Sequence, residues 1–329
     1  MSDADQALLQ RAEAASEALA RAKGEIAKVV FGQERVVELA LCAVLAGGHA
    51  LLVGAPGLAK TRLCAALGTV LGLPWGRVQF TPDLMPADII GSEVLEEDAT
   101  GKRNFRFIPG PLFTNLLMAD EINRASPRTQ SALLQAMQEN HVTVTGQTYA
   151  LPRPFHVLAT QNPIEQEGTY PLPEAQLDRF LLQIDVPYPD AETERRILIE
   201  TTGAQDVEAG PALEPGALQA VQTLVRTLPV GEKVVESILK LVRSARPDAQ
   251  GSAEARAQVS WGPGPRAGQA LMLAARARAL LRGRLAPTID DVLALARPAL
   301  AHRMAMSFTA KAEGRSVEDL IDRLAVEAG

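Results

Sequence analysis

A glycine-rich loop follows a short apolar segment near residue 50, and the two together most restrict the fold of this chain. Residues 50–53 read Ala-Leu-Leu-Val between two glycines, a run typical of a strand that is buried on both faces of a parallel sheet. The next residues nearly match the phosphate-binding pattern GxxxxGK[ST] and lead into a helix expected over 60–71. They are Gly54, Ala55, Pro56, Gly57, Leu58, Ala59, Lys60 and Thr61. A strand, such a loop and a helix in this order predict a nucleotide-binding α/β domain.

The residue types in this loop suit a polyphosphate. Glycines let backbone N–H groups turn toward phosphate oxygens, and the start of the following helix adds partial positive charge. We expect Lys60 to reach the β- and γ-phosphates and the Thr61 hydroxyl to bind Mg²⁺. Ala59 stands where the pattern has its second glycine, and because a methyl group is the smallest possible intrusion, we expect the loop to survive. The alternative is an ordinary glycine-rich turn between a strand and a helix.

Strand-like and helix-like segments alternate as far as residue 187, after helices expected over 5–29 and 34–46. Apolar runs predict four more strands, and helical patterns separate them, notably over 126–139 with Ser126 as its N-cap. These four runs are 77–80, 115–119, 155–159 and 181–186. The alternation predicts an α/β fold with a doubly wound, five-stranded parallel sheet over 1–187.

Two stretches, near 92–107 and 141–152, interrupt this alternation and predict inserted hairpins, with turns at 99–101 and at Gly146-Gln147. After residues 187–190 the strand patterns stop, and we expect a smaller, all-helical domain over 188–329, with a loop at 246–258. Thr288 and Asp291 in this second domain have the spacing of a capping box.

Polar residues follow two of the expected strands. Asp120 and Glu121 end the run that begins at 115, and Asn162 follows the run at 155–159. Because α/β folds bind ligands at the carboxyl edge of the sheet, we expect these residues close to the loop. Asp120 would hold Mg²⁺, Glu121 would orient or deprotonate the attacking water, and Asn162 would place that water. Taken alone, two acids or an Asn-Pro pair commonly mark only a solvated turn.

Two arginines are candidates for stabilising charge on a γ-phosphate. Arg179 precedes the fifth expected strand, and Arg266 opens a helix of the second domain. An arginine that reaches the transferred group can contribute ~10³–10⁵ in rate. Spacing does not distinguish such an arginine from a surface one, and we expect the arginine cluster over 276–284 to form solvated faces or arginine–carboxylate pairs.

Composition excludes several classes of protein. The longest apolar stretch, 39–46, is far shorter than the ~18 residues of a membrane span, and the N-terminus lacks the pattern of a signal peptide. Cys42 and Cys64 lie in apolar helical contexts, which indicates reduced thiols in the cytoplasm. A net charge of -6 and only 4% aromatic residues argue against nucleic acid as a partner. We expect a cytoplasmic protein without direct membrane insertion.

The chain resembles the MoxR family of AAA+ ATPases. The likeness covers 29–61, 107–139 and 155–180, with further similarity at 262–266 and 287–303, and the alanine before the loop lysine is itself typical of the family. It implies an AAA+ P-loop core with a helical lid, binding of ATP and Mg²⁺, and ATP hydrolysis.

The resemblance also implies roles that spacing does not give. Val30, Gly32 and Gln33 look like the segment that packs on adenine. Asn162 looks like the first sensor, Arg266 like a second sensor that reaches the nucleotide of its own subunit, and Arg179 like an arginine finger for the nucleotide of a neighbour. A finger of this kind implies a homo-oligomeric ring, usually of six, in which the two hairpins point toward the pore.

The implied function is an ATP-driven, chaperone-like motor that remodels or matures protein clients together with a von Willebrand factor A domain partner. Two alternatives stay open. One is a nucleotide-gated scaffold that recruits such a partner with slow turnover, because every hydrolysis residue also binds nucleotide. The other is a motor subunit of the metal-chelatase type, because related clades share these motifs.

Overall fold

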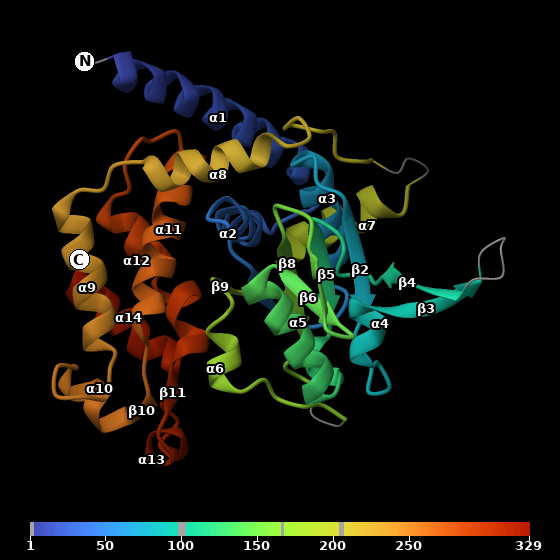
Figure 1. Ribbon diagram of the computed structural model, residues 1–329. Coiled ribbons are helices and arrows are strands. Elements are labelled where there is room, and N and C mark those ends of the chain that lie inside the picture. The colour runs from blue at the N-terminus through green and yellow to red at the C-terminus, as the bar shows by residue number, and fades with distance from the viewer. Residues whose placement is uncertain (1–2, 98–102, 166–167, 204–206) are drawn as a thin grey trace.

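A five-stranded parallel sheet lies at the centre of the computed structural model, which describes residues 3–97, 103–165, 168–203 and 207–329 (Figure 1). All neighbouring strands in it are parallel, as the sequence predicts. The strand ends differ from the expected ones by no more than two residues. The order of the strands is β2 (Trp75–Gln79), β5 (Leu116–Asp120), β8 (His156–Gln161), β1 (Ala50–Val53) and β9 (Leu182–Asp185).

Alternate residues of the strands enter two separate cores, one on each face of the sheet. In β1, Ala50 and Leu52 belong to the core that includes α1 (Asp3–Ala27), α2 (Glu34–Leu45) and α3 (Lys60–Val70). Leu51 belongs to the other core, with α4 (Pro86–Ile90) and α5 (Pro127–Glu139). Because both faces are covered, the strand is apolar at every position. Ser126 caps α5 as expected, since its side chain accepts a hydrogen bond from the Thr129 N–H.

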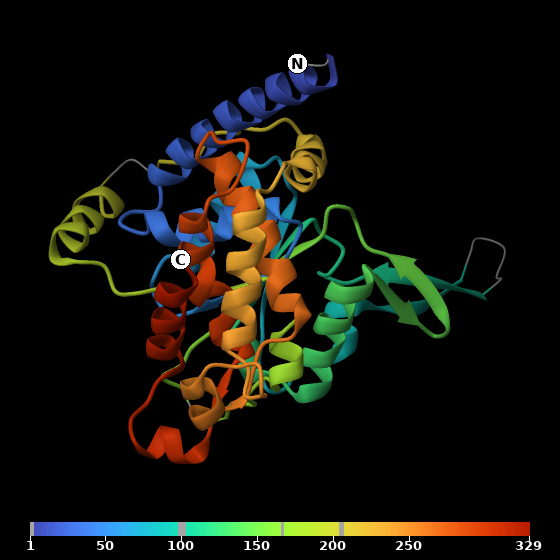
Figure 2. The ribbon, with the colours of Figure 1, turned by 90° about the vertical axis from the view of Figure 1, so that its left-hand side faces the viewer.

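Both expected hairpins are present and project from the same side of the sheet (Figure 2). They consist of β3 (Gly91–Glu97) with β4 (Arg103–Pro109), and β6 (His141–Val144) with β7 (Gln147–Ala150). The turn expected at 99–101 lies outside the described residues. The second turn is formed by Thr145 and Gly146, one residue earlier than predicted, because both carry the positive φ angles, 49° and 83°, that a two-residue hairpin turn requires. Phe107 and Tyr149 stack between the two hairpins.

The C-terminal part is helical, with one exception. The expectation of an all-helical domain is wrong where β10 (Val259–Trp261) pairs antiparallel with β11 (Ala305–Met306), strands too short to leave a period-two pattern. The expected loop at 246–258 also contains a helix, which Ser252 caps. The helices after the sheet are α6 (Glu174–Leu177), α7 (Ala191–Thr201), α8 (Ala217–Thr227), α9 (Glu232–Ser244), α10 (Ala253–Gln258), α11 (Pro265–Leu281), α12 (Ile289–Leu300), α13 (Phe308–Ala312) and α14 (Val317–Ala328).

Buried ion pairs join these C-terminal helices to the sheet domain. Arg278 of α11 contacts Glu38 of α2 at 3.1 Å and Asp291 of α12 at 2.6 Å. Arg282 also pairs with Glu38, and Arg284 with Asp291, so the arginine–carboxylate pairs expected in this cluster are confirmed. Asp291 also completes the predicted capping box with Thr288. The domain boundary near 187–190 stays a prediction.

Candidate active site

The glycine-rich loop, the two acids and Asn162 meet at the carboxyl edge of the sheet. They line one cavity of about 410 Å³. The loop follows β1, Asp120 ends β5, and Asn162 follows β8, so the parallel arrangement of these strands brings their ends to one edge. The structure therefore places Lys60, Thr61, Asp120, Glu121 and Asn162 together, as expected from the sequence.

Lys60 closes the loop on itself. Its ammonium donates hydrogen bonds to the carbonyl oxygens of Gly54 at 2.7 Å and Ala55 at 3.1 Å, and burial lowers its pKa. Helix α3 begins at Lys60, so the N–H groups of its first turn, which have no partner within the helix, lie at the cavity wall. Together the ammonium and the helix start make this wall electropositive.

Two small residues of the loop are explained by different constraints. Ala59, at the start of α3, has a φ of 55°, the left-handed conformation for which the usual pattern has glycine. A methyl group there costs about 1 kcal/mol. Gly54 instead lies against the chain after β9, where an added Cβ would be 2.7 Å from the carbonyl oxygen of Val186. The first glycine is thus required by packing, and the alanine is tolerated with some strain.

The hydroxyl of Thr160, which the sequence analysis missed, positions both acids. It accepts a hydrogen bond from the Glu121 N–H at 2.8 Å and donates one to Asp120 Oδ1 at 2.5 Å. Glu121 has a φ of 54°, an uncommon conformation for a residue with a side chain and one that clusters at functional sites. The sequence could have indicated Thr160 by its position, since it lies in the polar end of the strand that leads to Asn162.

Two further residues that the sequence analysis missed come from β2. Arg77 donates two hydrogen bonds to Asp120 Oδ2, from Nε at 3.1 Å and from Nη2 at 2.6 Å. Gln79 donates one to Glu121 Oε2 at 2.7 Å. Both line the cavity, because β2 pairs with β5 and places Gln79 opposite Asp120. No motif marks them, and their i,i+2 spacing on a strand is the only sequence signal.

Asn162 and the residues expected to contact adenine also adjoin the loop. Asn162 is buried, and its Oδ1 accepts a hydrogen bond from the Ile164 N–H at 3.1 Å, which fixes the amide at the cavity wall. Val30 and Gln33 are buried, and Gln33 donates a hydrogen bond to the Leu58 carbonyl at 3.1 Å. Gly32 has a φ of 65° and lies against α7. A role of this segment in packing on adenine stays a prediction.

Arg179 and Arg266 do not reach this cavity. Both line a second cavity, of about 260 Å³, together with Gly48 and His49. Those two residues precede β1 whereas the loop follows it, so the two cavities lie at opposite edges of the parallel sheet. The expectation that Arg266 reaches the nucleotide of its own subunit therefore does not fit the structure, because α11 begins at the amino edge.

The segment that carries Arg179 is fixed by Arg303, which the sequence analysis did not single out. Arg303 is buried and donates hydrogen bonds to Asp178 Oδ1 at 2.7 Å and to the carbonyl oxygens of Phe180 at 2.6 Å and Leu181 at 3.1 Å. Arg266 lies 3.5 Å from the other oxygen of Asp178. The Asp178 carboxylate thus contacts two arginines of the C-terminal part, beside the cavity that Arg179 and Arg266 line.

The residues at the carboxyl edge fit Mg²⁺ bound together with a polyphosphate. The Thr61 hydroxyl and the Asp120 carboxylate are the hard oxygen ligands that Mg²⁺ prefers. Among the described residues, no group of three or more His, Cys, Asp or Glu side chains could hold a metal ion. A cation here would depend on phosphate oxygens as further ligands, which is the usual arrangement for Mg²⁺.

Comparisons with known proteins agree with this geometry. A model of the ATPase family associated with various cellular activities matches residues 49–182, and a model of the AAA lid domain matches 252–324. The chain is 41% identical to Chaperone MoxR1 of Mycobacterium tuberculosis over 93% of this chain and 80% of the relative. It is 35% identical to Protein MoxR of Paracoccus denitrificans over 85% of this chain and 86% of the relative. A crystal structure assigned as an ATPase from Cytophaga hutchinsonii superposes with a TM-score of 0.89 at 35% identity, over 98% of each chain.

Proposed function

The chain belongs to the MoxR family of AAA+ ATPases, and we propose that it hydrolyses ATP with Mg²⁺ as a homo-oligomeric ring that remodels or matures protein clients in the cytoplasm. The observation that supports the proposal is the carboxyl-edge cavity, which is lined by the glycine-rich loop, by the expected Mg²⁺ ligands Thr61 and Asp120, and by the expected base Glu121. No helix in the described ranges is long and apolar enough to cross a membrane.

Each copy would supply binding and the base for its own nucleotide. The loop N–H groups and Lys60 would hold the phosphates, and the lysine would exchange the carbonyls of Gly54 and Ala55 for phosphate oxygens. Thr61 and Asp120 would hold Mg²⁺, which neutralises charge on the phosphates. Glu121 would orient and deprotonate the attacking water.

The neighbouring copy would supply the arginines. Arg179 and Arg266 line one cavity at the edge opposite to their own loop, and Arg179 has no side-chain partner among the described residues. If the amino edge of one copy meets the carboxyl edge of the next, the guanidiniums of Arg179 and Arg266 approach the γ-phosphate of the nucleotide bound to that next copy. Such a contact joins two different surfaces of the same protein, and it closes into a ring when the rotation allows. We propose six copies, as the family resemblance implies.

A protein client is favoured over nucleic acid by the net charge of -6. The hairpin formed by β3 and β4 exposes Leu95 and Phe105, 49% and 72% accessible, which could contact an unfolded segment. A relative of this chain carries the name chaperone. We also propose a von Willebrand factor A domain protein as partner, a pairing that rests on the family resemblance alone.

The test of hydrolysis is Mg²⁺-dependent ATP turnover in the wild type and in Glu121→Gln. We expect the variant to bind ATP and to lose at least about a hundredfold in turnover, the size of a general-base contribution. Glu174→Gln, at an exposed acid on α6, is the matched control. Equal turnover in the wild type and in Glu121→Gln would reject the hydrolase, and intact cellular function in that variant would favour the nucleotide-gated scaffold.

The test of the shared site is subunit mixing. Lys60→Ala removes phosphate binding but keeps the arginines, whereas Arg179→Ala keeps the loop and removes the finger. Each variant alone should be inactive. A mixture should regain activity, because some interfaces then combine an intact loop with an intact Arg179. A mixture that assembles but stays inactive would contradict the trans arrangement.

A further inference from the structure

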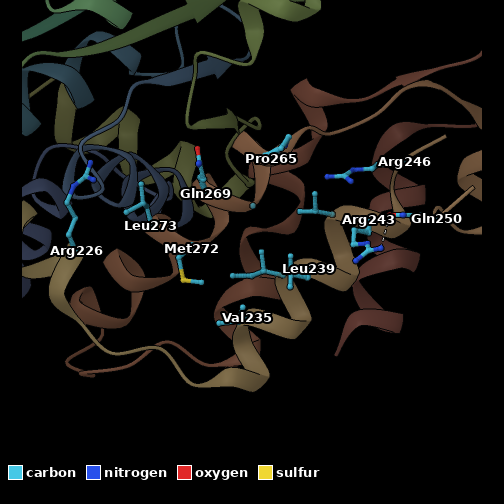
Figure 3. Close-up of a pocket in the computed structure, with 13 residues that line it drawn as sticks. Arg226, Val235, Leu239, Arg243, Arg246, Gln250, Pro265, Gln269, Met272 and Leu273 are labelled. Atoms are coloured by element: carbon cyan, nitrogen blue, oxygen red, sulfur yellow. Dashed lines mark hydrogen bonds between the residues drawn. The ribbon is translucent and has the colours of Figure 1, made fainter. Parts of the chain in front are cut away.

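An apolar groove with a basic rim lies among the C-terminal helices. It has a volume of about 1040 Å³ and runs between α9 and α11, with α8 at one end (Figure 3). Leu239, on its wall, is 46% exposed. Its apolar lining consists mainly of Val235, Ile238, Leu239, Val242, Met272 and Leu273. An exposed surface of this kind marks a site of interaction.

Three arginines give the groove positive charge. Arg226 lies at one end of the apolar lining, and Arg243 and Arg246 lie together at the other end (Figure 3). Arg243 donates a hydrogen bond to the neutral Gln250 at 2.7 Å, and Arg246 donates one to the carbonyl of Pro263 at 3.1 Å. Within the described part of the chain, none of the three forms an ion pair. The groove is therefore complementary to an acidic, amphipathic segment.

Helix α7 of the same chain has these properties. None of its residues is buried, and Leu198 and Ile199 are 65% and 64% exposed. Glu192 and Glu194 flank this apolar pair on the outward side of the helix, given 100° of rotation per residue, and the exposed Arg195 lies between Leu198 and Ile199. The face therefore carries two acids and one cation. Neither carboxylate has a side-chain partner among the residues that the structure describes. A helix of eleven residues is marginal by itself in water, so a packing partner would stabilise it.

The other side of α7 contacts residues 31–32 of its own copy. Thr193 lies against Gly32, and the Arg196 guanidinium lies 4.5 Å from the centre of the Phe31 ring. In Figure 1 the groove helices α9 and α11 lie at the left and α7 lies to the right, on the far side of the sheet. In this arrangement a chain does not fill its own groove with its own α7.

We propose that α7 of one copy docks into the α9–α11 groove of the next copy. Leu198 and Ile199 enter the apolar floor, and Glu192 and Glu194 face the rim arginines. The groove continues into the cavity of Arg179 and Arg266, since Gln269 and Leu273 line both. A neighbour that brings its nucleotide edge to these arginines also brings its α7 to the groove. Because the docking joins copies of a ring, it depends on the assembly in the proposed function.

Cysteine cross-linking tests this contact in the full-length protein. A chain carrying Leu198→Cys and Leu239→Cys is oxidised under mild conditions with nucleotide present, and the two natural cysteines are buried. We expect a ladder of covalent oligomers. Chains that carry only one of the two substitutions, mixed in equal amounts, should give dimers and no ladder. The matched control pairs Leu198→Cys with Val326→Cys, a site on α14 that is 81% exposed, and should give no ladder.

Assembly provides a second measurement. Leu198→Asp should raise the concentration needed for assembly at least tenfold in sedimentation velocity, whereas Val326→Asp should leave it unchanged. Two results overturn the docking alone, provided that the wild type assembles and subunit mixing restores turnover. One is unaltered assembly of Leu198→Asp, and the other is absence of the cross-linked ladder between positions 198 and 239. A wild type that never assembles with nucleotide overturns the proposed ring, and the docking with it.

Discussion

Mild acid should destabilise this protein through histidines that are buried in their neutral form. His49 lies at the amino edge of the sheet, where Nε2 donates a hydrogen bond to the Met137 carbonyl at 3.2 Å and Nδ1 accepts one from the Val157 N–H at 3.0 Å. Both ring nitrogens are therefore engaged, and a proton on Nδ1 would face the N–H of Val157. Burial, together with the neighbouring His156, lowers the pKa of His49 to about 3.

The size of the effect follows from the difference in proton binding. The unfolded chain binds a proton at His49 below about pH 6.5, while the folded chain does not until about pH 3. The stabilisation is therefore complete above pH 6.5 and is lost as the pH falls, by about 1.4 kcal/mol per pH unit. Between pH 6.5 and 5, His49 alone removes about 2 kcal/mol, a substantial part of a typical ~5–15 kcal/mol. Burial also lowers the pKa of His156 and His302, so both act in the same direction.

The assay is urea unfolding at pH 7.5, 6.5, 5.5 and 5.0 without nucleotide. His49→Asn keeps an oxygen that can accept the hydrogen bond from Val157 but has no group that titrates. We expect this variant to be less stable than the wild type at pH 7.5. Below pH 6.5 its free energy of unfolding should fall less steeply than that of the wild type, the two slopes differing by about 1.4 kcal/mol per pH unit. Identical slopes in the wild type and in His49→Asn would refute the reasoning.

Further predictions concern single contacts of the two cavities. Thr160→Val removes the hydroxyl that bonds to both acids. The lost hydrogen bonds to these acids are worth about 1.5–3 kcal/mol, so we expect kcat in steady-state turnover to fall tenfold to hundredfold with little change in ATP affinity. An unchanged kcat would contradict this role. Ala59→Gly relieves the left-handed alanine, so the Tm should rise by about 2 °C in calorimetry, whereas a fall would show that the strain is absent. Arg303→Ala leaves Asp178 without its buried partner and should lower the free energy of unfolding by about 3 kcal/mol, while Arg315→Ala at the surface should change it little; similar losses in both would reject the anchoring role.

The carboxyl-edge site was largely predictable because its main residues lie in the loop after β1 or at the ends of two other strands. Asp120 and Asn162 follow apolar runs whose parallel alignment could be inferred, and parallel strands align their ends without further information. Arg77 and Gln79 could not be found in this way. They act across the sheet, through the register of β2 with β5, and a register is not visible in one strand.

The position of Arg266 depended on contacts that a local pattern does not contain. Its helix is held at the amino edge by the ion pair of Arg278 with Glu38, and by the bonds of Arg303 to the Arg179 turn. These partners are separated by more than a hundred residues in the sequence. The helical content of the C-terminal part was predictable, but the edge on which it packs was not.

Strand β8 links the two edges that a ring would join. At its start, His156 Nδ1 donates a hydrogen bond to the Gly48 carbonyl at 2.8 Å, in the segment that lines the arginine cavity. Near its end, Thr160 bonds to both acids of the nucleotide cavity. Because the strand is paired on both sides and its core is close-packed, it cannot shift at one end alone without breaking hydrogen bonds. Any movement of the acids that follows hydrolysis must therefore either be absorbed at Thr160 or displace the Gly48 segment beside Arg179. In the proposed ring, this strand would therefore connect the nucleotide of one copy to the arginines that the copy would present to its neighbour.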